Sequence, residues 1–442
     1  MKFYSSVASA RRSGGAGIPV VSFEEAVVRG LAPDGGLYMP ERIDPLPPSF
    51  FADAPNMDFR TIARAMAGNL LEDSIAPAEL DRIIDEVLTF DAPLVEVQPG
   101  RFALELFHGP TLAFKDFGAR FLSRVLGFFA LKSGRSITIL VATSGDTGSA
   151  VAHGFLNTPG IRVVILYPSG KVSELQEKQF TTLGGNITAL EVDGTFDDCQ
   201  RLVKQAFSDP SLQQELFLAS ANSINIARLI PQSFYYGYAW SRLASKGEVV
   251  FSVPSGNFGN LTAGLIAKRM GFPFGPFVAS TNVNDVVPSY LATGEYHPRS
   301  SATTISNAMD VGNPSNFDRI ITLFGGDLEA IRRDIIGYAF TDDETRNAMR
   351  QVLTSTGYLM DPHGAVGWLG LEKFQRAHGH QGPGVFLETA HPAKFREAVE
   401  SVTGQTVELP PALSMLKDRE KTSIPFGKDY ASFRDWIRTT LR

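Results

Sequence analysis

Short continuous apolar runs alternate with amphipathic segments along most of the chain, and this alternation predicts parallel α/β sheets. Four runs read as buried strands, namely SITILVAT, IRVVILYP, ITALEVDG and EVVFSVP. A segment with helical spacing follows each of them, starting near residues 148, 172, 196 and 260. Strands that are buried on both faces read as continuous apolar runs, and parallel strands need crossover helices between them. We therefore expect parallel sheets that are covered by helices.

The stretch FKDFGARFLSRVLGFFALKSG gives the clearest helical pattern. Apolar residues recur at helical spacing from position 114 to position 128, and Gly134 supplies a C-terminal cap. A strand at 101–109 precedes this helix. Late in the chain, residues 382–390 read as a further strand and residues 392–400 as a helix.

The length of 442 residues predicts two or three domains, because a single core rarely grows beyond about 300 residues. Residues 22–91 read as mostly helical, with Gly/Pro-rich punctuation, so we predict an N-terminal helical layer at 1–95. A smaller α/β domain at 96–235 and a larger one at 236–442 would follow. Residues 281–355 carry no pattern from which elements can be assigned.

Composition and charge narrow the classes of function. The net charge of -6 offers no electrostatic footprint for nucleic acid. No apolar run reaches the roughly 18 residues of a membrane span. The one cysteine, Cys199, excludes a disulfide framework and is expected to pack inside a helix. The histidines lack metal-ligand spacing, so we assign no metal. We expect a cytoplasmic protein.

The first residues, MKFYSSVASARRSGGAG, allow two interpretations. They contain Ser, Arg and Lys but no acidic residue, which weakly resembles an organellar transit peptide. We favour a short ordered segment, because Phe3 and Tyr4 are suited to docking on a core.

Three strand-to-helix junctions carry small and polar residues where an anion could bind. In VPSGNFGNLTAG, the glycines allow the backbone to curl below a helix N-terminus, which favours a phosphate. In VATSGDTGSA, hydroxyls and backbone N–H groups suit a carboxylate. In SANSINIARLIPQ, amides and a guanidinium suit a phosphate or carboxylate. Taken alone, each could equally be an ordinary glycine-rich turn, an N-capping turn or a solvated helix start.

Lys115 lies among phenylalanines at the first turn of a helix. The helix N-terminus and the apolar setting both disfavour the ammonium form and lower its pKa. A neutral amine is what imine chemistry with an aldehyde requires. The alternative is a lysine that reaches to solvent and pairs with Asp116. One candidate amine beside three anion sites favours an aldehyde cofactor that carries a phosphate, together with an amino-acid substrate.

Five motifs together carry a resemblance to a known family. HGPTLAFKDFGARF, ATSGDTGSA, NSINIARLIPQ, PSGNFGN and ETAHPAKF occur in this order and resemble those of the longer threonine synthases. These belong to the tryptophan-synthase-β-like enzymes, which use pyridoxal 5'-phosphate and have fold type II. The resemblance covers most of the chain. It implies two parallel-sheet α/β domains behind an N-terminal helical layer.

The resemblance also implies roles for individual residues. Lys115 would form the Schiff base with the cofactor and then move protons, and Thr389 would face the pyridine nitrogen. The cofactor phosphate would be held by Gly256, Asn257, Phe258, Gly259 and Asn260. The substrate carboxylate would be bound by Ser144, Gly145 and Thr147. The substrate phosphate would be contacted by Asn222, Ser223 and Arg228.

The role of Asp146 stays open at this point. Many relatives have Asn here, where it bonds the 3'-oxygen of the cofactor, whereas the longer threonine synthases resemble this chain in having Asp. A carboxylate beside a phenolate-like oxygen is repelled unless the two share a proton. We count Asp146 among the residues that contact the cofactor.

The resemblance implies conversion of O-phospho-L-homoserine and water to L-threonine and phosphate, the last step of threonine biosynthesis, in a monomer or homodimer. One alternative is a phospholyase or dehydratase on the same scaffold that releases 2-oxobutyrate. Another is a non-catalytic ligand sensor, against which the retention of Lys115 speaks. The active site is expected between a smaller domain with the TSGDTG loop and a larger one with the SGNFGN loop.

Overall fold

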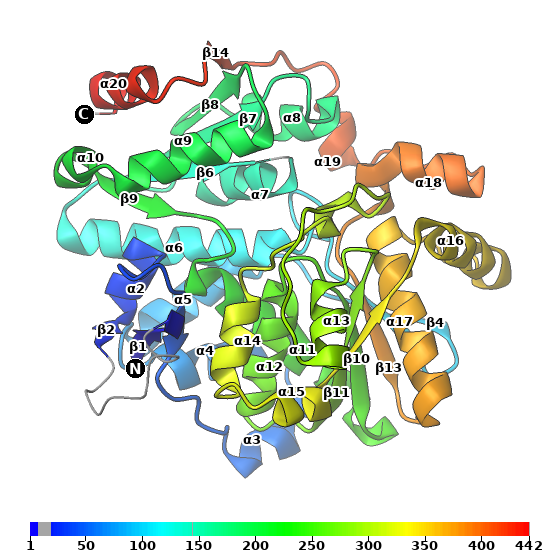
Figure 1. Cartoon of the computed structure of the whole chain (residues 1–442). Coiled ribbons are helices and arrows are strands. Elements are labelled where there is room, and N and C mark those ends of the chain that lie inside the picture. Colours follow the sequence, from blue (N-terminus) through cyan, green and yellow to red (C-terminus); the bar gives the residue numbers. More distant parts are fainter. Residues whose placement is uncertain (8–18, 144, 442) are drawn as a thin grey trace.

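The apolar runs form two separate sheets, and Figure 1 shows the smaller one above the larger. The computed structural model describes residues 1–7, 19–143 and 145–441. Within these residues, all neighbouring strands of the smaller sheet are parallel, in the order β14-β8-β7-β6-β9. The strands are β6 (Ile137–Ala142), β7 (Ile161–Pro168), β8 (Ile187–Val192), β9 (Phe217–Ser220) and β14 (Ile424–Phe426). The three strands predicted here are confirmed.

Alternate residues of the smaller sheet face different helices, as expected for strands that are buried on both sides. Ile139 and Val141 belong to the core that α6 and α7 share, whereas Leu140 and Leu166 pack with α9 and α20. The helices of this part of the molecule are α6 (Lys115–Ser133), α7 (Asp146–Phe155), α8 (Glu174–Thr181), α9 (Phe196–Ser208), α10 (Pro210–Glu215) and α20 (Tyr430–Thr440). Gly134 caps α6 with a φ of 64°, as its sequence position predicts.

The larger sheet has the strand order β12-β11-β10-β13-β5-β4, and only β4 runs antiparallel to its neighbour. Strand β10 lies at its centre, where Phe251 is paired with Phe277 of β11 and Val385 of β13. The strands are β4 (Leu94–Gln98), β5 (Arg101–Glu105), β10 (Val249–Pro254), β11 (Phe274–Thr281), β12 (Ile335–Ala339) and β13 (Gly384–Glu388).

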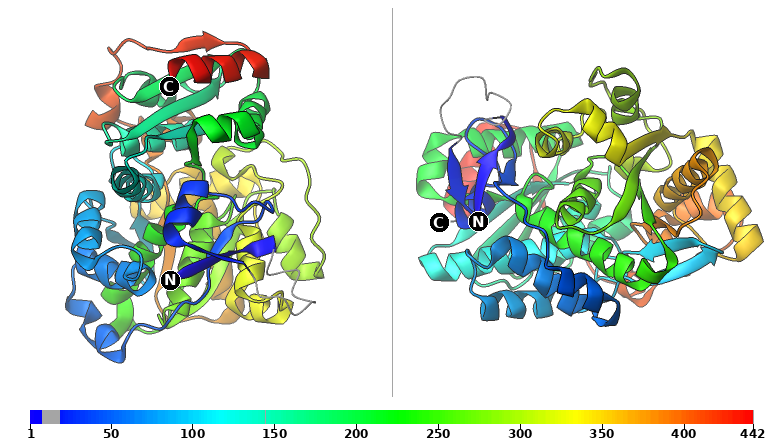
Figure 2. Two further views of the ribbon diagram at one scale, coloured as in Figure 1. Left: turned by 90° about the vertical axis from the view of Figure 1, so that its left-hand side faces the viewer. Right: turned by 90° about the horizontal axis from the view of Figure 1, so that it is seen from below.

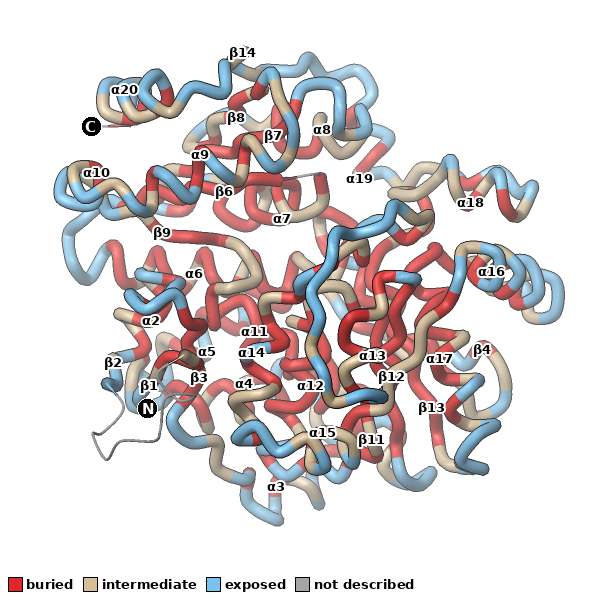
Figure 3. The backbone as a smooth tube through the Cα atoms, viewed as in Figure 1, coloured by how far each residue is buried: buried red, intermediate tan, exposed pale blue. Residues whose placement is uncertain are grey.

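Helices also cover both faces of the larger sheet. The core under α11 and α12 includes Phe251 and Phe277, and Val250 and Phe386 pack on the opposite face with α16 and α17. Figure 3 shows β10, β13 and α11 in the buried colour, while the outer side of α16 is exposed. The helices are α11 (Ile226–Leu243), α12 (Gly259–Arg269), α13 (Val286–Thr293), α14 (Phe317–Leu323), α15 (Leu328–Asp334), α16 (Asp342–Thr356), α17 (Pro362–His378), α18 (Arg396–Thr403) and α19 (Pro411–Ser414).

The N-terminal layer is helical, as predicted, but it also contains a small antiparallel sheet in the order β2-β1-β3. Phe3 of β1 is 1% exposed and packs against Phe23, so its predicted docking on a core is confirmed. Residues 8–17 of the predicted ordered N-terminal segment lie outside the described residues. The elements are β1 (Lys2–Ser5), β2 (Val20–Ser22), β3 (Tyr38–Pro40), α2 (Phe23–Arg29), α3 (Pro48–Asp53), α4 (Phe59–Leu71) and α5 (Pro77–Val87).

Sheet membership bears on the predicted domain boundaries, which stay a prediction. Strand β5 follows residue 95 but belongs to the larger sheet. Strand β14 follows residue 236 but belongs to the smaller sheet, and α20 packs beside it. The side view in Figure 2 shows the two lobes, with the N-terminus on the lower one and the C-terminus on the upper one. Among the residues described, no helix has the length and apolar composition to cross a membrane.

Candidate active site

A cleft of about 1980 Å³ lies between the two sheets. Its walls include the loop after β6, the loop after β10, the residue after β13 and the start of α6. In open parallel sheets, ligands bind outside the carboxyl ends of the strands, where loops and helix N-termini meet. The cleft contains the TSGDTG and SGNFGN loops, as the sequence predicts.

Lys115 opens α6 and points into this cleft. Its side chain is 20% exposed, and its Nζ lies 3.6 Å from Oδ2 of Asp146. Burial lowers the pKa of Lys115, the charge of Asp146 raises it, and the cations of Lys394 and Arg228 lower it further; the net shift is downward. A lysine with a lowered pKa has a larger neutral fraction, which can attack an aldehyde.

Asp146 begins α7 and is bound by more than Lys115. Its Oδ1 lies 2.8 Å from Nζ of Lys394 and accepts a hydrogen bond of 3.0 Å from Nε2 of Gln176. Burial raises the pKa of this carboxyl, but the two lysines and Gln176 outweigh that effect and hold the pKa well below its usual range. Asp146 is therefore an ionised carboxylate.

Lys394 is a residue of the site that the sequence interpretation missed. It lies in the short 3-10 helix η4 (Pro392–Phe395), and its side chain is 1% exposed. A signal was present, because ETAHPAKF is one of the five motifs, but only Thr389 of that motif was given a role.

The loop before α7 is held by its own hydroxyl groups. Thr143 Oγ1 accepts hydrogen bonds from the backbone N–H groups of Gly145 at 2.9 Å and Gly148 at 2.8 Å. Gly145 has a φ of 139°, and a Cβ there would lie 2.6 Å from Oε1 of Gln176, so only glycine fits. Thr147 lines the cleft. Ser144, the third residue predicted for the substrate carboxylate, lies outside the described residues.

The loop after β10 curls tightly below the N-terminus of α12. Phe258 adopts the left-handed conformation with a φ of 61°, which is unusual for a residue other than glycine. A Cβ on Gly256 would lie 2.7 Å from Cα of Met309, so a larger residue has no room. All five residues predicted for the cofactor phosphate line the cleft, including Gly259 at the first turn of α12.

Asn260 of this loop presents a free donor. Its Oδ1 accepts hydrogen bonds from the hydroxyls of Tyr235 at 2.6 Å and Tyr236 at 2.7 Å, whereas its buried Nδ2 has no protein partner. A buried donor without a partner is costly, and a phosphate oxygen would satisfy it. The free donor, the curled loop and the helix N-terminus together fit the phosphate of pyridoxal phosphate.

The three residues predicted for the substrate phosphate also line the cleft. Ser223 Oγ accepts a hydrogen bond of 2.6 Å from Nδ2 of Asn257, which joins this group to the loop after β10. Arg228 is buried and donates from Nη1 to the carbonyl oxygen of Ala221. Its Nε has no partner in the protein, and burial lowers its pKa to about 10. The backbone N–H of Asn222 donates a hydrogen bond of 3.3 Å to Oγ of Ser220.

The buried guanidinium of Arg319 stabilises the segment that contains Ser223. Arg319 of α14 donates to the carbonyl oxygens of Tyr38, Ser223 and Ile224. It lies in the range 281–355, where no pattern allowed elements to be assigned from the sequence. Arg319 therefore connects the N-terminal layer to the loop that precedes α11.

Thr389 follows β13, lines the cleft and is 7% exposed. Its carbonyl oxygen accepts a hydrogen bond of 2.8 Å from the backbone N–H of Phe114, which ties the start of α6 to the larger sheet. The residue predicted to face the pyridine ring thus lies beside the helix that carries Lys115.

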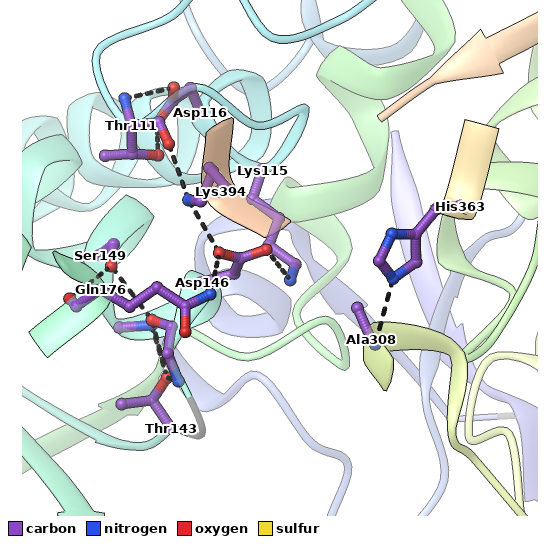
Figure 4. Close-up of polar contacts among 12 residues, drawn as sticks. Thr111, Lys115, Asp116, Thr143, Asp146, Ser149, Gln176, Ala308, His363 and Lys394 are labelled. Atoms are coloured by element: carbon purple, nitrogen blue, oxygen red, sulfur yellow. Dashed lines mark hydrogen bonds and ion pairs between the residues drawn. The ribbon is translucent and has the colours of Figure 1, made fainter. Parts of the chain in front are cut away.

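His363 is a further residue of the cleft wall to which the sequence interpretation gave no role. Its Nε2 accepts from the backbone N–H of Ala308 at 3.2 Å, so in the neutral ring the proton is on Nδ1 (Figure 4). Nδ1 then donates to Asp361, 2.5 Å away. In the part of the chain that the structure describes, no cluster of three His, Cys, Asp or Glu side chains could hold a metal.

The fold and the site define an enzyme that uses pyridoxal phosphate. Residues 92–388 match the sequence model of the family described as pyridoxal-phosphate dependent enzyme. Residues 9–88 match the model for the threonine synthase N terminus, and residues 364–437 match the one for its C-terminal part. The chain belongs to the threonine synthase family.

Both similar sequences and solved structures support this membership. The chain is 45% identical to threonine synthase of Escherichia coli over 94% of its own length and 96% of that protein. It is 46% identical to that of Haemophilus influenzae over the same shares. The crystal structure of the Escherichia coli enzyme superposes with a TM-score of 0.88 at 42% identity, covering 99% of this chain and 100% of that one.

A structure of PLP-bound threonine synthase from Brucella melitensis superposes with a TM-score of 0.92 at 36% identity, covering 99% of both chains. Maize serine racemase shares only the fold, with a TM-score of 0.53 at 14% identity over 73% of this chain and 96% of that one. The predicted family, fold type II and pyridoxal phosphate cofactor are confirmed. The protein is a PLP-dependent lyase of threonine biosynthesis.

Proposed function

We propose that this chain converts O-phospho-L-homoserine and water to L-threonine and phosphate in the cleft between its two sheets. The observation that carries this proposal is the position of one lysine with a lowered pKa beside two anion-binding loops in a threonine synthase family member. One loop suits the cofactor phosphate and the other the substrate phosphate.

Residues from both lobes would hold the cofactor. Lys115 would provide the amine for the covalent link to the aldehyde, and Thr389, which follows β13, would contact the ring. Asn260 would donate from its free Nδ2 to the phosphate, together with the N–H groups of residues 256–259. Bound in this way, pyridoxal phosphate supplies the electron sink that makes protons on the neighbouring carbons acidic.

The remaining steps are proton transfers and charge stabilisation by the protein. Lys115, which lines the cleft and has a lowered pKa, removes the proton from Cα of the substrate and returns protons later. Gly145 and Thr147, with Ser144, orient the substrate carboxylate. Arg228, Asn222 and Ser223 hold the phosphate at Cγ as a dianion until the carbon–oxygen bond breaks.

The overall balance needs one water molecule. A proton leaves Cβ and phosphate leaves Cγ. Cγ then gains a proton and becomes a methyl group, and water adds to Cβ as a hydroxyl group while its other proton is released. Closure of the two lobes on the substrate would exclude water during the early steps. Crystals grown with and without substrate test this, and identical lobe angles in the two would contradict it.

One assay separates this reaction from its alternatives. The holoenzyme is incubated with O-phospho-L-homoserine, and the organic product is identified beside the released phosphate. Threonine in a one-to-one ratio with phosphate supports the proposal. 2-Oxobutyrate with ammonia would identify a phospholyase or dehydratase, and no phosphate release would leave only a ligand sensor.

We further expect this enzyme to act in the cytoplasm as a monomer or homodimer, without nucleic acid or a membrane. Light scattering of the purified holoenzyme measures the mass against 48.0 kDa for one chain. A mass above two chains would contradict the expected assembly.

A further inference from the structure

Lys394 forms a buried ion pair that the proposed reaction steps do not use. Besides its contact with Asp146, its Nζ donates to the carbonyl oxygen of Thr111 at 2.8 Å and lies 3.4 Å from Oε1 of Gln179. An ammonium group that is almost fully buried is retained only where it is paired. The structure gives this one an anionic partner inside the cleft wall.

Asp146 is held between two amines. Lys394 and Gln176 both contact Oδ1, and the other oxygen, Oδ2, faces Nζ of Lys115 at 3.6 Å (Figure 4). The orientation of the carboxylate is therefore fixed through Oδ1 by Lys394 and Gln176. Its second oxygen is directed at the nitrogen that carries the chemistry.

The charges around this nitrogen set its protonation together. Asp146 alone would form a close ion pair with Lys115 and keep it as an ammonium. Lys394 supplies a positive charge on the opposite side of that carboxylate, so Asp146 and Lys394 together carry no net charge. Three other charged or titratable groups interact electrostatically with Lys115 or Lys394, namely Asp116, His153 and Arg228.

These three groups do not replace Lys394. Asp116 is bound by the backbone N–H and the hydroxyl of Thr111, at 2.8 Å and 2.6 Å. Arg228 adds positive charge near Lys115, and its Nη1 donates to the carbonyl oxygen of Ala221. Burial lowers the pKa of His153 to about 4, so that ring is neutral near pH 7. Lys394 is thus the cation that balances Asp146.

We propose that Lys394 is a positioning residue, which keeps Asp146 ionised and aimed at position 115 and thereby lowers the affinity of that nitrogen for a proton. This inference rests on the proposed function, because it requires that Lys115 carries the cofactor. It also gives Asp146 a defined task. The carboxylate orients the nitrogen, and Lys394 prevents it from trapping the nitrogen as a cation.

The test is the pH midpoint of the visible absorption change of the bound cofactor, which reports protonation of the linking nitrogen. Lys394→Met should raise this midpoint by about one pH unit, because it leaves Asp146 unbalanced. Asp146→Asn should lower it by about the same amount, because it leaves Lys394 unbalanced. The double variant removes both charges and should return close to the wild-type midpoint, and Lys394→Arg should resemble the wild type.

Lys268→Met is a matched control. Nζ of Lys268 lies 2.7 Å from Asp334 Oδ1 and donates to a backbone carbonyl oxygen at 3.2 Å, and neither residue lines the cleft. This variant should leave the midpoint unchanged. If the role of Lys394 were only structural, Lys394→Met and Lys268→Met would both lower thermal stability, and neither would shift the midpoint.

Shifts in the same direction for Lys394→Met and Asp146→Asn, or no shift in a folded Lys394→Met protein, would overturn the inference. Should Lys394→Met fail to fold, Asp146→Asn and the double variant still decide, because they differ only in the charge of Lys394. Equal midpoints for those two would overturn it. Failure of the proposed function is distinct, since the product assay would then show no threonine, whereas the midpoints require only that the cofactor is attached at Lys115.

Discussion

The hydroxyl of Tyr236 donates a hydrogen bond of 2.7 Å to Oδ1 of Asn260. Tyr235 donates a second one to the same oxygen at 2.6 Å. Both acceptor directions of the amide oxygen are then occupied, so the amide is fixed with Nδ2 toward the cleft. Two tyrosines of α11 thus determine which face of Asn260 a ligand meets.

This arrangement predicts a specific loss of cofactor affinity. Asn260→Ala should weaken binding of pyridoxal phosphate to the apoprotein about tenfold, because it removes a donor to a charged group. Fluorescence titration of the apoprotein measures the effect. Asn347→Ala, at an exposed position of α16, is the control. Unchanged affinity in the Asn260 variant would show that this amide does not contact the cofactor.

Lys115→Ala should abolish both covalent attachment and turnover. The amine provides the link to the aldehyde and the proton transfers, and general acid–base groups contribute at least about 100-fold to a rate. Borohydride reduction followed by peptide mass analysis measures attachment, and phosphate release measures turnover. Lys132→Ala, at the far end of α6 with a side chain 58% exposed, should behave as the wild type. Turnover that survives in the Lys115 variant would contradict the proton-transfer role.

Arg228→Lys should raise the KM for O-phospho-L-homoserine about tenfold or more, since it removes hydrogen bonds to a charged group. Affinity for the cofactor should change little, because a different loop holds its phosphate. Steady-state kinetics and inhibition by inorganic phosphate measure the change. Arg242→Lys, at the opposite end of α11, serves as the matched variant. An equal loss of cofactor binding would place Arg228 at the wrong phosphate.

The contact between Glu191 and Lys421 predicts an acid-dependent loss of stability. Their oxygen and nitrogen are 2.7 Å apart. Burial raises the pKa of Glu191, but hydrogen bonds from Lys421 and Ser169 lower it, with a net shift from 4.5 to about 2. Because the folded pKa lies below the unfolded one, the unfolded state takes up the proton first as the pH falls. The stabilisation is complete above the unfolded pKa and disappears as the pH falls toward the folded one.

Glu191→Gln should therefore be less stable than the wild type at pH 7, and the difference should shrink as the pH falls below about 4.5. Urea unfolding at several pH values measures it. Glu408→Gln, at an exposed position, should show no such trend. A constant difference across the whole range would mean that the ion pair does not carry the effect.

Phe433→Ala should lower the free energy of unfolding by about 3 to 5 kcal/mol, because it leaves a cavity in a closed core. Phe433 of α20 is 0% exposed and packs with residues of the smaller sheet. Phe217→Ala is the control, since Phe217 is 39% exposed on β9. Calorimetry measures both. Equal effects would contradict the packing of α20 on this sheet.

The local pattern of apolar residues predicted the strands that are buried in the folded protein. The strands β6, β7, β8 and β10 read as continuous apolar runs because both of their faces are covered, so each position was informative. The loops after β6 and β10 were found for a related reason. Small residues between a strand and a helix form a pattern that can be recognised from the local sequence alone.

The elements that were missed depend on contacts that are distant in sequence. Strands β12 and β14 are short and gain their strand structure from neighbours that lie more than fifty residues earlier. In the segment 281–355, Asn282 and Asn284 donate to Asp310, and this polar network fixes an irregular loop without any apolar period. Lys394 was missed because its partner is Asp146, on the other sheet.

The edge strand β14 has a consequence for synthesis. Residues 424–440 pair and pack with a sheet whose other strands are made before residue 221, and strands β10 to β13 of the larger sheet are translated in between. These strands of the larger sheet must therefore be synthesised before β14 can pair with β8. Until then, β8 presents open backbone groups, and a chaperone that shields such an edge would find its substrate here rather than in the larger lobe.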